Sequence, residues 1–124
     1  MCVALGLLCF AGSSALGQAT PLRVTINAKA GLQYDVVRFE AKPASKVELK
    51  LVNNDDMAHN LVLTKPGQRE AVANAALALG TEGDAKNWVP DLDSVLFSIP
   101  VLKPDSSHVL RFITPKSPGV YPYV

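Results

Sequence analysis

The clearest strand pattern in this chain is Lys46-Val47-Glu48-Leu49-Lys50-Leu51, and it indicates the type of fold. Polar and apolar residues alternate strictly through it, and this period of two is typical of a β-strand with one face in a core and the other in water. The preceding segment, 42–45, contains a proline, which fixes the backbone angle φ and removes a backbone donor. The two features together predict a half-buried strand that follows a tight turn.

Similar strand patterns recur at short intervals on both sides. We expect further strands over residues 22–27, 34–39, 61–63, 94–99, 109–113 and 119–124. One segment, 68–79, consists instead of helix-forming residues between Pro66 and Gly80, and it predicts a helix that either covers an open end of the sandwich or forms a functional flap. This spacing of short strands indicates an all-β sandwich or barrel.

The N-terminal segment differs in composition from the rest. Residues 1–19 are mostly small or apolar and carry no charged side chain, and their apolar run is too short to span a bilayer as a helix. Segments 15–17 and 17–19 both offer the small-residue pattern that signal peptidase recognises. We predict a signal peptide over 1–19 and a periplasmic or secreted mature domain over 20–124; a retained membrane anchor is the alternative.

Length, cysteines and charge limit the function classes. Both cysteines, Cys2 and Cys9, lie in the predicted signal, so the mature domain would contain no disulfide. The mature part is long enough for one core and too short for two, and it has no predicted membrane span. Because the formal net charge of the chain is only +1, the sequence gives no indication of a nucleic acid or an anionic membrane as partner.

A polar turn after the strand predicted over 46–51 ends in a histidine. The stretch is Asn53-Asn54-Asp55-Asp56-Met57-Ala58-His59-Asn60-Leu61-Val62-Leu63. A lone histidine is usually structural or solvated. A position at a strand start behind an Asn/Asp turn holds the backbone firmly, however, and suits a metal ligand. His59 is therefore a candidate ligand, whereas the acidic pair before it indicates turn formation rather than acid/base catalysis.

Three stretches together resemble the cupredoxins, specifically the azurin and auracyanin-like blue copper proteins. They are Val47-Glu48-Leu49-Lys50-Leu51-Val52-Asn53, Asp56-Met57-Ala58-His59-Asn60 and Ser117-Pro118-Gly119-Val120-Tyr121-Pro122-Tyr123-Val124. The resemblance covers nearly all of the mature chain. It implies a Greek-key β-sandwich with one short helical flap.

The resemblance also implies a copper site. In this family two histidines and a cysteine thiolate hold copper in a plane, with a weak axial ligand that is usually methionine. His59 matches the first histidine, and Ala58 lies where a backbone carbonyl can approach the metal weakly. Asn60 matches an asparagine whose side chain ties the ligand loops together.

The chain departs from the family at its C-terminal end. The family's Cys-His-Met ligand loop and last strand would follow Val124, so we expect an incomplete domain, with an open sheet edge and a weakened fold. If the gene continues, its next codon should encode cysteine. Neither Met57 nor His108 is expected to replace the absent ligands, because Met57 suits packing at a loop edge and His108 a structural place near a strand start.

These expectations lead to a functional prediction. The leading hypothesis is an exported electron-transfer domain that cycles Cu(II)/Cu(I), is not an enzyme, and meets redox proteins such as cytochromes or oxidoreductases through a weak apolar contact. The alternative is a non-redox β-sandwich that serves as a binding or structural module, with at most weak copper binding through His59. A fragment of a multicopper oxidase or nitrite reductase is a third hypothesis, but such enzymes need His-x-His pairs, which this sequence lacks.

Overall fold

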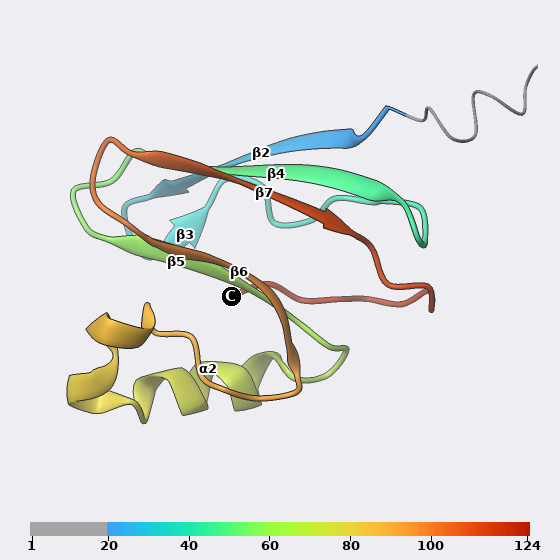
Figure 1. Ribbon diagram of the computed structural model, residues 1–124. Helices are drawn as coiled ribbons and strands as arrows, with labels where there is room; N and C mark the ends of the chain where they lie inside the picture. The colour runs from blue at the N-terminus through green and yellow to red at the C-terminus, as the bar shows by residue number, and fades with distance from the viewer. Residues whose placement is uncertain (1–19) are drawn as a thin grey trace, which may run out of the picture.

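The computed structural model describes residues 20–124, which form two β-layers with a helical segment beside them (Figure 1). The larger sheet has the strand order β3-β2-β4-β7, and the smaller one pairs β5 with β6. The strands are β2 (Leu22–Lys29), β3 (Gln33–Tyr34), β4 (Lys46–Asn53), β5 (His59–Thr64), β6 (Val95–Leu102) and β7 (Ser107–Ile113). This arrangement confirms the predicted all-β sandwich.

Strand β4 is the centre of the larger sheet. It pairs in parallel with β2 and antiparallel with β7. The alternation predicted for this strand is confirmed, since Val47, Leu49 and Leu51 are buried in the core. On the outer face, Glu48 accepts hydrogen bonds from Arg23 and Arg111 on the two neighbouring strands.

Strand β5 is flanked on both sides. It pairs antiparallel with β6, and its other edge meets the C-terminal segment. The backbone N–H of Val62 donates to the carbonyl of Val124 at 2.8 Å, and the N–H of Val124 donates back at 3.0 Å. The strand expected over 119–124 is thus reduced to an isolated bridge between Leu63 and Tyr123.

The strand expected over 34–39 is also shorter than predicted. The structure has only the two residues of β3, which pair with the end of β2. Among the described residues, the backbone of 37–41 makes no backbone hydrogen bond. A strand exists only where a second edge completes the ladder, and this segment has none in the described structure.

The predicted helix is confirmed as α2 (Arg69–Leu77). In Figure 1 it lies on the side of β5 and β6 that is away from the larger sheet, and its Val72 is buried. Two short 3₁₀ turns, η2 (Gly80–Glu82) and η3 (Asp84–Lys86), follow between the helix and β6. No helix within residues 20–124 has the length and apolarity of a membrane span. The predicted signal peptide, 1–19, lies outside the described residues.

Candidate metal centre

One buried amide closes the turn that leads to His59. Asn53, the last residue of β4, is fully buried. Its Nδ2 donates to the carbonyls of Met57 at 2.7 Å and Leu102 at 3.0 Å, and its Oδ1 accepts the N–H of Asp55 at 2.9 Å. Because a single side chain binds the turn and β6 together, the first residue of β5 has a defined position.

The imidazole of His59 is held by a carboxylate. Its Nε2 lies 2.7 Å from Oδ2 of Asp55, and the two side chains are only 7% and 5% exposed. The hydrogen bond from His59 lowers the pKa of Asp55 below its usual value, against the opposing effect of burial. The other oxygen, Oδ1, accepts the N–H of Asp56 at 2.9 Å. The ring is therefore oriented by a carboxylate that is itself fixed.

The second ring nitrogen of His59 remains available. Among the described residues no hydrogen bond reaches Nδ1. Every side-chain nitrogen or oxygen that is completely buried in this part of the chain has a hydrogen-bond partner, so Nδ1, which has none, must be partly accessible. His59 lines an open groove together with Ala58 and Asn60. A ring nitrogen without a proton in this position is a potential metal ligand.

The groove beside His59 is large and mainly apolar. Its volume is about 1340 Å³, and the segments 37–43 and 117–124 contribute many of the residues that line it. Several large apolar side chains that line it are exposed to solvent: Leu32, Val37, Met57, Leu77 and Val120. Met57 thus lies at the rim of the groove, as the sequence indicated.

Asn60 connects β5 to the loop before β6. Its Nδ2 donates to the carbonyl of Asn87 at 2.8 Å. Asn87 has a left-handed φ of 54°, and its Oδ1 accepts the N–H of Val101 at 3.1 Å. In the described structure the Asn60 amide therefore fixes the loop over one end of β5, and its predicted role between ligand loops stays a prediction.

A partly buried tyrosine supports the same strand. The hydroxyl of Tyr34 donates to the carbonyl of Asn60 at 2.7 Å, and the Tyr34 ring lies 5.8 Å from that of Tyr123. Burial raises the pKa of Tyr34 to about 12, with a further contribution from Tyr123. The folded protein therefore favours the neutral form of the Tyr34 side chain.

This raised pKa predicts a loss of stability at alkaline pH. The neutral Tyr34 phenol contributes about 2 to 3 kcal/mol to the free energy of unfolding. This contribution is fully present below the unfolded pKa of about 10 and is lost as pH rises toward the folded pKa of about 12. We expect tyrosinate absorbance to show one group titrating near pH 12 in the folded protein. Urea unfolding should show a stability loss between about pH 9 and about pH 11 that is smaller in Tyr34→Phe. An equal loss in both proteins would contradict the assignment.

The described residues provide only part of a copper coordination set. No group of three or more His, Cys, Asp or Glu side chains within 20–124 is placed to hold a metal ion, and this range contains no cysteine. The other histidine, His108, is exposed at the second position of β7, opposite Leu51. His59 fits the role of one imidazole ligand, and residues 20–124 lack the thiolate.

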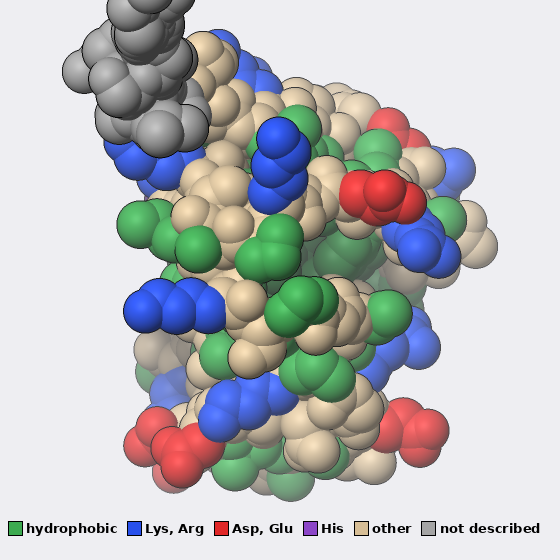
Figure 2. Space-filling model, turned by 90° about the vertical axis from the view of Figure 1, so that its right-hand side faces the viewer, with side chains coloured by type: hydrophobic (Ala, Val, Ile, Leu, Met, Phe, Trp, Pro, Cys, Tyr) green, Lys and Arg blue, Asp and Glu red, His purple; other side chains and the backbone are tan. Residues whose placement is uncertain are grey.

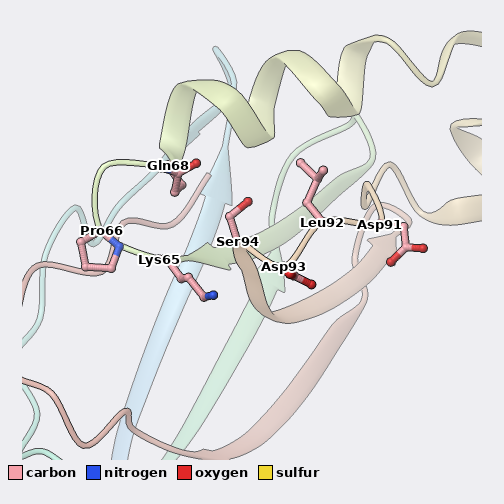
Figure 3. A pocket seen from close by; sticks show the side chains of 7 residues that line it. All are labelled: Lys65, Pro66, Gln68, Asp91, Leu92, Asp93 and Ser94. Atoms are coloured by element: carbon pink, nitrogen blue, oxygen red, sulfur yellow. The ribbon is translucent and has the colours of Figure 1, made fainter.

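A second hollow lies where β5 leads into α2, beside the loop before β6. Figure 3 shows its lining, in which the charged ends of Lys65, Asp91 and Asp93 lie apart from one another. A backbone hydrogen bond from Lys65 to Ser94, 2.8 Å long, joins the two segments. This hollow has no converging polar groups and offers no second site.

The surface charge is dispersed. On the face shown in Figure 2, Lys and Arg side chains are spread over the surface, a few Asp and Glu lie near its margins, and apolar side chains lie between them, some in a hollow. Such mixed charge fits the formal net charge of +1 and gives no field of one sign.

The sequence alone does not reveal the pairing of Asp55 with His59 or the role of Asn53. It indicates a turn residue at position 55, and the Asp55 carboxylate does accept the N–H of the following residue. Residues four apart, such as Asp55 and His59, are neighbours on a helix. In a turn the same spacing does not predict whether the two side chains meet. The relevant signal was an Asn-x-Asp sequence directly after a buried strand, which favours side-chain to backbone bonding.

Known structures with the same arrangement are blue copper proteins. No protein-family model and no curated protein matches the sequence. Auracyanin A, a "blue" copper protein of Chloroflexus aurantiacus, is similar with a TM-score of 0.74 and 25% identity, over 85% of this chain and 86% of that chain. The Na-dithionite reduced auracyanin of Roseiflexus castenholzii gives 0.74 and 21%, over 85% and 84%.

An azurin from the obligate methylotroph Methylomonas sp. strain J is more distant. Its TM-score is 0.60 at 16% identity, over 76% of each chain. The similarity places this chain in a known architecture. Its elements here are the two sheets, the short helix beside the smaller sheet and the strand β5 that begins at His59. Residues 20–124 have the cupredoxin fold, in the form found in auracyanins and azurin.

Proposed function

We propose that this protein is a copper-carrying electron-transfer domain in which His59 is a copper ligand through Nδ1. The observation that carries the proposal is the free Nδ1 of a ring that is otherwise buried, fixed at Nε2 and placed at an apolar groove. The blue copper proteins with the same fold support the choice of copper. The thiolate and the second imidazole of a blue copper site would come from polypeptide outside residues 20–124.

The residues of this chain supply rigidity rather than catalysis. When bound, copper supplies a one-electron change between Cu(II) and Cu(I). Asp55 and Asn53 keep the His59 ring in one position, and a fixed ligand reduces the rearrangement that accompanies a change of oxidation state. Ala58 lies beside His59 along the groove, where its backbone carbonyl is proposed as a weak additional contact.

The proposed partners are redox proteins such as cytochromes or oxidoreductases, met in the periplasm or outside the cell. The exposed apolar side chains around the groove, among them Val37, Met57 and Val120, support a contact of this kind. A small apolar patch without strong charge suits brief, weak encounters.

A non-redox module is the second candidate. It is favoured by one observation: within residues 20–124 the groove is lined by one imidazole, that of His59, and this range contains no cysteine. Such a domain would bind copper weakly through His59 or serve as a structural β-sandwich.

Titration of the purified protein with Cu(II) tests the assignment of His59. We expect electron paramagnetic resonance to show nitrogen ligation that is lost in His59→Ala, with an affinity at least ten times lower, because the ring nitrogen is the fixed donor at the groove. His108→Ala is the matched control, since it removes an exposed imidazole from β7. Unchanged Cu(II) binding in His59→Ala would refute the proposed ligand.

A sample that includes the polypeptide proposed to supply the thiolate separates the two candidates. In that sample an intense thiolate-to-copper visible band with a reversible Cu(II)/Cu(I) wave supports the electron carrier. Nitrogen-bound Cu(II) with neither property supports the non-redox module.

A further inference from the structure

A carboxylate faces the buried edge of the His59 ring. We propose that Asp55 is a positioning residue that holds neutral His59 in its Nε2–H tautomer and thereby makes Nδ1 the metal-binding atom. The proposal rests on the proposed function only in naming the metal. The selection of the tautomer is a property of the metal-free protein.

The hydrogen bond determines which nitrogen carries the proton. A neutral imidazole has one N–H donor and one acceptor nitrogen, and an ionised carboxylate only accepts. With Oδ2 of Asp55 at 2.7 Å from Nε2, the proton of the neutral ring belongs on Nε2. The lone pair of His59 then lies on Nδ1, which has no hydrogen-bond partner among residues 20–124.

Asp55 is held in place from two directions. Its own N–H donates to Oδ1 of Asn53 at 2.9 Å, and its Oδ1 accepts the N–H of Asp56 at 2.9 Å. Asn53 in turn belongs to β4, the central strand of the larger sheet. A continuous set of hydrogen bonds therefore extends from the sheet to the imidazole, so the ring orientation is set by the fold before any metal arrives.

A carboxylate at this place also affects the donor strength of the ring. A carboxylate behind a ligating histidine fixes the ring and makes the opposite nitrogen more basic, and removal of such a partner typically lowers metal affinity about 10- to 100-fold. We expect this loss in Asp55→Ala and a smaller loss in Asp55→Asn, whose side-chain oxygen can still accept from Nε2.

Nitrogen NMR of the metal-free protein is the direct test. The wild-type spectrum should show His59 protonated at Nε2 and bare at Nδ1. Asp55→Ala should give a mixture of both tautomers, and Asp55→Asn should retain the wild-type form. Asp56→Ala is the matched control, because it removes an exposed carboxylate from the adjacent position.

Three results would overturn the proposal. They are a wild-type ring protonated at Nδ1, a wild-type tautomer in folded Asp55→Ala, and an equal change in Asp56→Ala. The first of these results is measured on the wild-type protein, so the proposal can still be tested if Asp55→Ala does not fold. A ring protonated at Nε2 in a protein that does not bind Cu(II) through His59 would support the inference and refute the proposed function, so the two failures are distinguishable.

Discussion

Replacing Asn53 by alanine is expected to lower the free energy of unfolding by roughly 3 kcal/mol. The side chain is fully buried and makes three hydrogen bonds, to the backbones of Asp55, Met57 and Leu102. Alanine leaves all three backbone groups without this partner, and each lost hydrogen bond of this kind costs on the order of 1 kcal/mol. The turn before His59 should also become more mobile, because the Asn53 side chain joins the end of β4 to the carbonyls of Met57 and Leu102.

Urea unfolding followed by circular dichroism measures this loss. Asn54→Ala is the matched control, since Asn54 is the adjacent asparagine and, among the described residues, its side chain bonds at an exposed position to Asn27 alone. We expect the control to lose less than about 1 kcal/mol. If Asn53→Ala were as stable as this control, the hydrogen bonds of the Asn53 amide would not stabilise the fold as the structure indicates.

Replacing Leu49 by alanine should produce a loss of similar or greater size. Leu49 is completely buried at the middle of β4, between Val24 on β2 and Leu110 on β7. Truncation of a buried leucine removes apolar contacts and leaves a cavity, which together cost about 2 to 5 kcal/mol. The central strand is bonded on both sides and has little freedom to collapse into the space, so we expect the upper half of this range.

Thermal or urea unfolding of Leu49→Ala should be compared with that of Lys50→Ala. Lys50 is the next residue of the same strand and is exposed on the outer face. The control should change stability by less than about 0.5 kcal/mol. Comparable losses of stability in the two variants would mean that the alternation of buried and exposed side chains along β4 does not determine which residues form the core.

The strands that the sequence predicted well are those with a strong local pattern and a ladder partner. For β4, alternation of polar and apolar residues was sufficient, because both neighbours are present in the sheet. The helix was also predictable, since Pro66 and Gly80 bound a run of helix-forming residues, and Gly80 has a positive φ of 53°. In both cases the signal is local and its period matches the element.

The strands that the sequence overestimated lack ladder partners. Residues 34–39 carry a strand pattern, but the structure forms only β3 there, and the backbone of 37–41 makes no backbone hydrogen bonds within the described part of the chain. Residues 119–124 form a bridge instead of a strand. Propensity favours extended backbone, whereas a strand requires a second edge, which no local pattern can supply.

His59 illustrates the division between sequence and tertiary structure most clearly. The β-sandwich, the polar turn and the candidate imidazole at a strand start could be predicted from the residues alone, because these follow from short-range periodicity and turn chemistry. Which nitrogen of that imidazole has no partner within residues 20–124 depends on the folded chain. It brings the end of β4, the Asp55 carboxylate and β6 around one buried ring, and such convergence depends on packing between distant segments.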